Sequence, residues 1–89
     1  MATLIVRHRV EDFGKWKAAY EAFEPVRKEM GVTGQGALQS DNDPNEVTAW
    51  HSFDTMDQAK AFAGSAQLKE AMAGAGVVGA PDIWFGEDI

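Results

Sequence analysis

The spacing of apolar residues changes early in the chain, and this change restricts the possible folds more than any other feature. From Thr3 to Val10, apolar and polar residues alternate with a period of two, which indicates a β-strand. Asp12 can then cap a helix whose apolar residues recur at steps of three and four: Phe13, Trp16, Tyr20, Phe23, Val26 and Met30. The chain therefore begins with a strand and continues into an amphipathic helix that runs to about Met30.

Prolines and glycines divide the next part of the chain. Pro25 lies within the helix and cannot donate a backbone hydrogen bond, so we expect a kink or a short break near Glu24. The glycines at 31, 34 and 36 end the helix, and a second strand is expected over residues 36–41. The turn-forming residues 41–45 then separate it from a third strand over residues 46–53.

The second half of the chain predicts a helix in two pieces and a last strand. Thr55 and Gln58 match a capping box, so a helix is expected to start at Thr55. Gly64 and Ser65 form a joint before a second piece, which carries Leu68, Ala71, Met72 and Ala75 on one face. Glycines 74, 76 and 79 and Pro81 are expected in a connection, followed by a strand over residues 82–85 and a tail over 86–89.

The order β-α-β-β-α-β has a preferred solution, because each strand-helix-strand crossover is right-handed and the helices then cover one face of the sheet. The predicted fold is a single α+β domain, residues 1–89, with a four-stranded antiparallel sheet in a ferredoxin-like sandwich. Ile5, Trp50 and Trp84 are expected on the open face of this sheet. A second copy of the chain is the simplest cover for such an apolar patch, which predicts a homodimer.

Composition excludes several classes of function. A domain of 89 residues buries about 60 to 65% of its unfolded surface, so a partner subunit would add useful burial. The formal charge of −6, with basic residues scattered singly, argues against nucleic acid as a partner. Without cysteine there is no disulfide and no sulfur-based zinc site, and the two histidines show no metal-ligand spacing. No apolar run approaches membrane-spanning length and no signal peptide is recognisable, so we expect a cytoplasmic protein.

Two glycine motifs do not indicate a nucleotide cofactor. The residues 74–79 match G-x-G-x-x-G, but a helix precedes them and a strand follows, which is the reverse of the dinucleotide fingerprint. The glycines at 31, 34 and 36 likewise follow a helix and lack the lysine and hydroxyl of a P-loop. We therefore expect no cofactor.

Two long segments resemble a known group of proteins. They are VRHRVEDFGKWKAAYEAFEPVRKEMGV and SDNDPNEVTAWHSFDTMDQAKAFAGSAQLKEAMAGAGVVGAPDIWF, and together they resemble small bacterial proteins of the dimeric α+β barrel superfamily, close to the antibiotic biosynthesis monooxygenase-like group. The cues are the Asp-Phe-x-x-Trp-Lys entry to the first helix, the Asp-Pro-Asn turn, and the segments at residues 59–62 and 68–72.

The resemblance implies a homodimer whose sheets pack face to face, with a pocket in each subunit between its sheet and its helices. Proteins of this fold include cofactor-free oxygenases acting on phenols and quinols, haem degraders and lactone isomerases. The haem degraders use an asparagine early in the first strand and a histidine on the second helix. This chain has neither, and its second helical segment MDQAKAFAGSAQLKEAMA contains no histidine, which argues against haem chemistry.

The two histidines are the natural candidates for proton transfer near neutral pH. By strand parity His8 shares the more apolar face of its strand with Leu4, Val6 and Val10, and His51 shares a face with Val47, Ala49 and Phe53. Both imidazoles are thus predicted to line one helix-sheet cavity, opposite each other and acting as base and orienter. The other predicted lining residues are Trp16, Tyr20, Phe23 and Phe62. The alternative is that each histidine is half exposed near a strand end and bonded to backbone.

Other conspicuous side chains have simpler explanations. Arg7 and Arg9 are expected on the opposite face, where they can pair with acidic residues such as Asp82 or Glu46. Trp50 shares that face and is predicted to pack at the dimer contact. Aromatic residues at helical spacing more often form core than a cofactor site.

Three functions remain open from the sequence. The first is a cofactor-free enzyme that oxidises or isomerises a small aromatic or enolic metabolite, with an imidazole taking a proton from it. The second is a module that binds such a metabolite without turning it over. The third is a dimeric structural domain whose cavity is filled by its own side chains.

Overall fold

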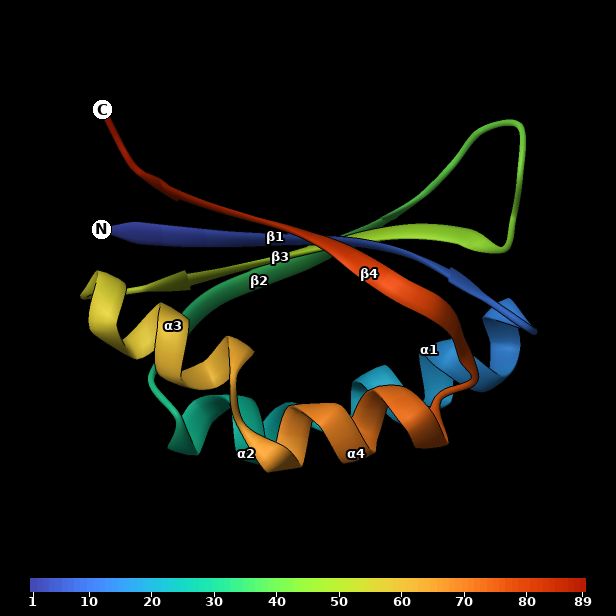
Figure 1. The fold of residues 1–89 in the computed structure, drawn as a ribbon, viewed down its shortest axis with the longest axis horizontal. Coiled ribbons are helices and arrows are strands. Elements are labelled where there is room, and N and C mark those ends of the chain that lie inside the picture. Colours follow the sequence, from blue (N-terminus) through green and yellow to red (C-terminus); the bar gives the residue numbers. More distant parts are fainter.

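The computed structural model describes residues 1–89 as one antiparallel sheet covered on one side by helices (Figure 1). The strand order is β2-β3-β1-β4, so the first and third strands are central. The strands are β1 (Ala2–Val10), β2 (Val32–Gln39), β3 (Glu46–Phe53) and β4 (Val77–Glu87). All three neighbouring pairs are antiparallel. The predicted βαββαβ ferredoxin-like α+β fold is confirmed.

The four helices lie on the same side of the sheet in Figure 1. They are α1 (Phe13–Ala22), α2 (Glu24–Glu29), α3 (Met56–Ala63) and α4 (Ala66–Gly74). The expected break near Pro25 is present, because α1 stops at its C-cap Phe23 and Pro25 falls in the first turn of α2, where no backbone donor is needed. No helix is both long enough and apolar enough to cross a membrane.

Side-chain caps fix where the helices begin. The carboxylate of Asp12 accepts a hydrogen bond from the backbone of Gly14 at the start of α1. The capping box of α3 is complete, since Thr55 Oγ1 accepts from Gln58 N and Gln58 Oε1 accepts from Thr55 N, each at 3.2 Å. Ser65 caps α4 after the expected joint at Gly64. Each of these starts agrees with the sequence prediction.

Two strands are longer than predicted. The second strand was expected over residues 36–41 and occupies Val32–Gln39 instead, because only Gly31, with φ of 94°, forms the turn. Gly36 lies inside the strand for a packing reason, since a β-carbon there would lie 2.6 Å from the indole nitrogen of Trp50. The fourth strand was expected over residues 82–85 and spans Val77–Glu87. It tolerates Pro81 because β4 is an edge strand, and the register shifts between Arg7 and Arg9 on its neighbour.

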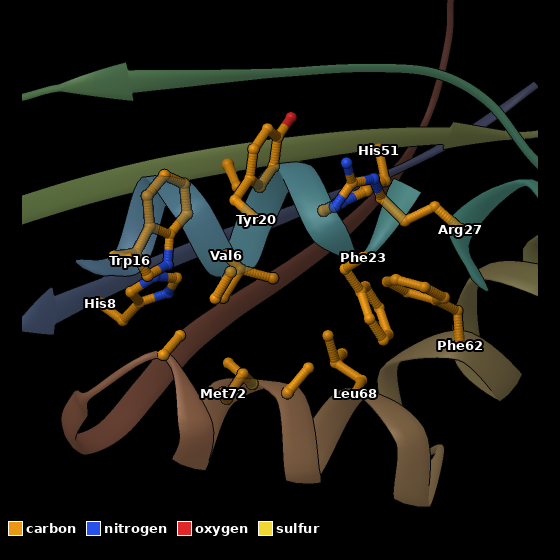
Figure 2. A pocket seen from close by; sticks show the side chains of 14 residues that line it. Val6, His8, Trp16, Tyr20, Phe23, Arg27, His51, Phe62, Leu68 and Met72 are labelled. Carbon is orange, nitrogen blue, oxygen red and sulfur yellow. The ribbon is translucent and has the colours of Figure 1, made fainter. Parts of the chain in front are cut away.

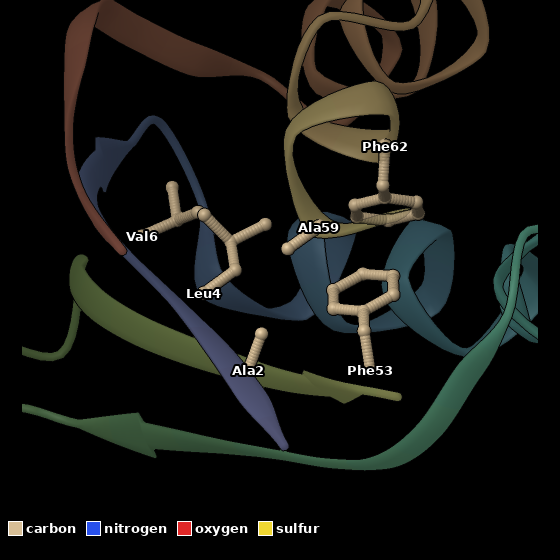
Figure 3. Close-up of a cluster of buried hydrophobic side chains, with 6 residues drawn as sticks. All are labelled: Ala2, Leu4, Val6, Phe53, Ala59 and Phe62. Atoms are coloured by element: carbon tan, nitrogen blue, oxygen red, sulfur yellow. The ribbon is translucent and has the colours of Figure 1, made fainter. Parts of the chain in front are cut away.

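One end of the helix-facing side holds a cluster of buried apolar side chains (Figure 3). We call this group the packed end; its buried members are Ala2, Leu4, Val6, Phe53, Ala59 and Phe62. Phe53 and Phe62 meet with ring centroids 5.5 Å apart in a tilted arrangement. A second buried cluster lies farther along the same face and contains Val10, Trp16, Val47, Ala49 and Ala75.

The other side of the sheet carries no helix and exposes a row of apolar side chains. Ile5 is paired with Trp50 on one side and with Trp84 on the other, and Trp50 is paired in turn with Gly36. One residue from each strand thus contributes to a band across the open face, as predicted. The flanking arginines form ion pairs there. Arg7 pairs with Glu46 at 2.9 Å as expected, and Arg9 pairs with Asp43 at 2.7 Å.

Candidate functional site

A cavity lies between the sheet and the helices, and it contains every site residue predicted from the sequence (Figure 2). Its volume is about 60 Å³, and eleven of its fourteen lining residues are hydrophobic. The predicted residues in its wall are His8, Trp16, Tyr20, Phe23, His51 and Phe62. The remaining lining residues are Val6, Ala19, Arg27, Ala49, Leu68, Ala71, Met72 and Ala75.

Both imidazoles are buried, so the half-exposed alternative is wrong. His8 is 7% exposed and His51 is 6% exposed, each on the helix-facing side of its strand. Both nitrogens of His8 and Nδ1 of His51 are buried without a hydrogen-bond partner. A buried polar atom left without a partner costs about 1 to 3 kcal/mol. All three atoms belong to residues that line one cavity, and this concentration of unpartnered polar atoms makes the cavity the candidate site.

Burial also determines the charge of the two histidines. Desolvation lowers the pKa of His8 below its usual value. It lowers the pKa of His51 to about 4, and the positive charge of Arg27 acts in the same direction. Both imidazoles are therefore neutral at pH 7, and His51 is in the protonation state that can accept a proton.

The two imidazoles do not face each other, contrary to the sequence prediction. The register of the central strands pairs His51 with Leu4 and pairs His8 with Val47. His8 is four residues beyond Leu4 along β1, which places the two histidines about 13 Å apart along the sheet. Figure 2 accordingly shows them at opposite ends of the cavity. A single reacting atom cannot contact both.

A stack of flat side chains forms the wall contributed by α1 and α2. The rings of His8 and Trp16 have centroids 5.7 Å apart, and the rings of Trp16 and Tyr20 stack at 4.9 Å. The guanidinium carbon of Arg27 lies 4.2 Å from the centroid of the Tyr20 ring. At the His51 end, Phe62 packs at 5.1 Å from the imidazole. Because the faces of Trp16 and Tyr20 are covered by their neighbours in the stack, an aromatic ligand would meet the ring edges, which suits edge-to-face packing.

Arg27 is the residue of the site that the sequence analysis missed. It is 2% exposed, yet its side chain lines the cavity beside His51 (Figure 2). Burial lowers the pKa of Arg27, but an arginine remains charged at any ordinary pH. The available signal was spacing, because Trp16, Tyr20, Phe23 and Arg27 follow one another at steps of four, three and four residues. An arginine in that apolar series predicts a charge directed into the core.

The size of the cavity limits what it can hold. An engineered apolar cavity that binds benzene has a volume of about 150 Å³, which is more than twice the volume here. A one-ring ligand therefore requires lining side chains to move, and the unbranched side chain of Met72 on α4 can do so readily. Haem and multi-ring molecules are far too large. No group of three or more histidine or carboxylate side chains is arranged to hold a metal ion.

No protein-family profile matches the sequence, and a sequence search of curated proteins finds no match. Solved structures match the fold over its full length. One is a candidate antibiotic biosynthesis monooxygenase from Bordetella bronchiseptica, with a TM-score of 0.84 at 18% identity, covering 99% of this chain and 96% of that one. Another, from Nitrosomonas europaea, has a TM-score of 0.78 at 19% identity and covers 100% and 99% of the two chains.

SnoaB from Streptomyces nogalater, a cofactor-independent oxygenase, matches with a TM-score of 0.80 at 9% identity and covers 99% of this chain and 92% of its own. The chain has the antibiotic biosynthesis monooxygenase-like fold. The resemblance predicted from the sequence is thus confirmed at the level of the fold. Sequence identities of 9 to 19% establish a shared fold and no shared reaction, so any chemistry depends on the residues of this chain.

Proposed function

We propose that this protein is a cofactor-free enzyme that removes a proton from a small phenol or enol bound in the helix-sheet cavity, with His51 as the general base. One observation carries the proposal: a neutral imidazole lies at the end of an apolar cavity, with Nδ1 lacking any protein partner. The fold shared with a cofactor-independent oxygenase supports the same class of reaction. Trp16, Tyr20, Phe23 and Phe62 are proposed to hold the ring of the substrate.

The chemistry needs no cofactor if the substrate itself is electron-rich. Proton transfer to His51 would leave a phenolate or enolate, which can reduce dioxygen directly and combine with it to form a peroxide at carbon. Loss of water from that peroxide gives a ketone or quinone. For a phenol with a free ring position, phenol and dioxygen yield quinone and water. Without dioxygen, return of the proton to another carbon would isomerise the substrate.

The test combines oxygen uptake with substitution of the base. A panel of one-ring phenols, hydroquinones and cyclic enols is assayed for oxygen consumption and for isomer formation under nitrogen. His51→Ala is expected to lower kcat by about 10²- to 10⁴-fold while leaving binding nearly unchanged. Gln67→Ala, on the exposed surface of α4, is the control and should retain full activity. Unchanged turnover in His51→Ala would overturn the assignment.

Binding without turnover is the second candidate. The low pKa of His51, about 4, makes it a weak base, and this favours a pocket that only holds its ligand. The panel separates the two functions, because a pure binding protein would bind members of the panel in a pocket-dependent manner and consume no oxygen. His8, at the far end of the cavity, would then serve as a second polar contact.

We also propose that two copies of the chain pack through their open sheet faces, as in a dimeric α+β barrel. The apolar band of Ile5, Trp50 and Trp84 supports this, since these side chains are 38%, 38% and 52% exposed in the single chain. Sedimentation analysis should give a dimer mass for the wild type, and Ile5→Lys should give a monomer. A monomeric wild type at high micromolar concentration would contradict the proposal.

A further inference from the structure

The cavity contains a positive charge that nothing in the protein neutralises. The side chain of Arg27 makes one hydrogen bond, from Nε to Oε1 of Gln35 at 2.6 Å, and Gln35 is a neutral amide. Each of the four ion pairs in the chain involves other residues. The remaining contacts of the guanidinium are with the rings of Tyr20 and Phe23, at 4.2 and 6.0 Å. A buried cation usually has a carboxylate partner, and this one does not.

The one carboxylate whose charge acts on Arg27 is already engaged. Glu24, one turn earlier on the same helix, pairs with Lys28 at 3.4 Å and has an exposed carboxylate. Its charge influences Arg27 without forming an ion pair. The two terminal nitrogens of Arg27 carry four N–H groups arranged in a planar fork, which matches the two oxygens of a carboxylate.

We propose that Arg27 binds the anionic group of the ligand, and that the ligands of this cavity are small aromatic acids of one ring with a single carboxylate. The wall between Arg27 and His8 is apolar and aromatic, so it suits an uncharged ring attached to that anionic end. Gln35, which accepts the hydrogen bond of Arg27, is the register partner of His51, and the charge of Arg27 acts on that imidazole, so a hydroxyl next to the carboxylate would lie near the proposed base. A second negative group has no partner in the cavity wall.

The inference rests on the proposed function, because it specifies the substrate class of the same cavity. An anion bound to Arg27 would also change the pKa of His51. Burial is the larger cause of the low pKa of His51, and the positive charge of Arg27 adds to it. An anion bound to Arg27 would oppose this second cause and so raise the basicity of His51 in part.

A simpler role for Arg27 is structural, since its bond to Gln35 ties α2 to β2. Three probes separate the two roles in the wild-type protein. Benzoate carries both ring and charge, benzamide carries the ring alone, and acetate carries the charge alone. Binding is followed by calorimetry and by NMR shifts of residues around the cavity. We expect benzoate to bind about tenfold or more tightly than either benzamide or acetate, as charge-assisted hydrogen bonds imply.

Substitutions then assign the effect to Arg27. Arg27→Gln should lower benzoate affinity to that of benzamide, and Arg27→Lys should retain part of the preference because the charge remains. Lys28→Gln removes the same charge from the exposed side of the same helix and should leave the preference unchanged. If Arg27→Gln does not fold, the comparison of the three probes in wild type still decides the question.

Each outcome has a definite meaning. Tighter binding of benzoate that depends on Arg27 supports the inference. Equal binding of benzoate and benzamide in the cavity would overturn it while leaving an aromatic pocket, and hence the proposed function, intact. A charge preference that survives Arg27→Gln would overturn it as well. If none of the probes shifts cavity residues and no neutral phenol binds there, both this inference and the proposed function are wrong.

Discussion

Two adjoining regions of the helix-facing side are built on the same two strands, yet they differ in what they bury. At the packed end, Leu4 and Phe53 are fully buried within a cluster of apolar side chains. The cavity beside it, which we call the cavity end, holds His8, His51 and Arg27, which are buried with few or no polar partners. Both ends follow the same alternation along β1 and β3, so the fold itself does not require the polar residues.

The difference shows which region serves stability and which serves a ligand. The packed end fills space with side chains that need no partner, and each contributes through burial. The cavity end leaves space unfilled and holds polar groups away from water, which lowers the stability of the folded state. Such an arrangement is typical of a site whose missing contacts a ligand provides. Three experiments test this contrast, and they are given in decreasing order of the expected change in the free energy of unfolding.

Truncation of a ring at the packed end should have the largest effect. Phe53→Ala is expected to lower the free energy of unfolding by about 3 to 5 kcal/mol, because the surrounding helices and strands cannot close the space. Met72 is only partly buried and already lines the cavity, so Met72→Ala should lower the free energy of unfolding by clearly less. Urea denaturation measures both. Equal losses would mean that the cavity end is packed as tightly as the other.

Acidification should destabilise the cavity end. The pKa of His51 is about 4 in the folded protein and about 6.5 when unfolded, so the unfolded chain binds more protons between these values. The contribution of His51 to the free energy of unfolding is fully present above pH 6.5 and falls by about 3 kcal/mol as the pH drops to 4. His8, whose pKa is also lowered, adds to the same loss. His51→Gln should remove its share of the pH dependence, and an unchanged slope would show that His51 is not buried as a neutral group.

The smallest effect is expected at Arg27, although its side chain is almost completely buried. Arg27→Met replaces a buried cation by an apolar side chain of similar length, and the free energy of unfolding should change by no more than about 1 to 2 kcal/mol in either direction. The lost bond to Gln35 and the contact with Tyr20 oppose the gain from removing a buried charge. A loss as large as that of Phe53→Ala would identify Arg27 as a structural tether instead.

The fold could be predicted from local patterns because each element has its own signal. Asp12, Thr55 and Ser65 define helix starts by capping chemistry, and Pro25 marks the break between α1 and α2. The strand ends were harder to predict. The glycines at 34 and 36 read locally as chain breakers, so the second strand was expected to begin only at Gly36, whereas β2 begins at Val32. The close approach of the Trp50 indole, from the neighbouring strand, explains the glycine at 36.

The candidate site was predictable in its membership but not in its geometry. Parity placed His8 and His51 on the correct face, and helical spacing placed Trp16 and Tyr20 in the same wall. Their separation along the sheet depends on the register of β1 against β3, which no local pattern specifies. Arg27 was missed because an arginine in a helix is normally solvated, and its burial follows from the packing of α2 onto β2.

The most direct test of the contrast is an NMR titration of the two imidazoles in the folded protein. It tests the central claim that the cavity end holds neutral, desolvated polar groups prepared for a ligand. We predict that His51 titrates with a pKa of about 4 and that His8 titrates below its usual value, while both titrate near 6.5 in the urea-unfolded chain. A His51 pKa of about 6.5 or higher in the folded protein would contradict the account.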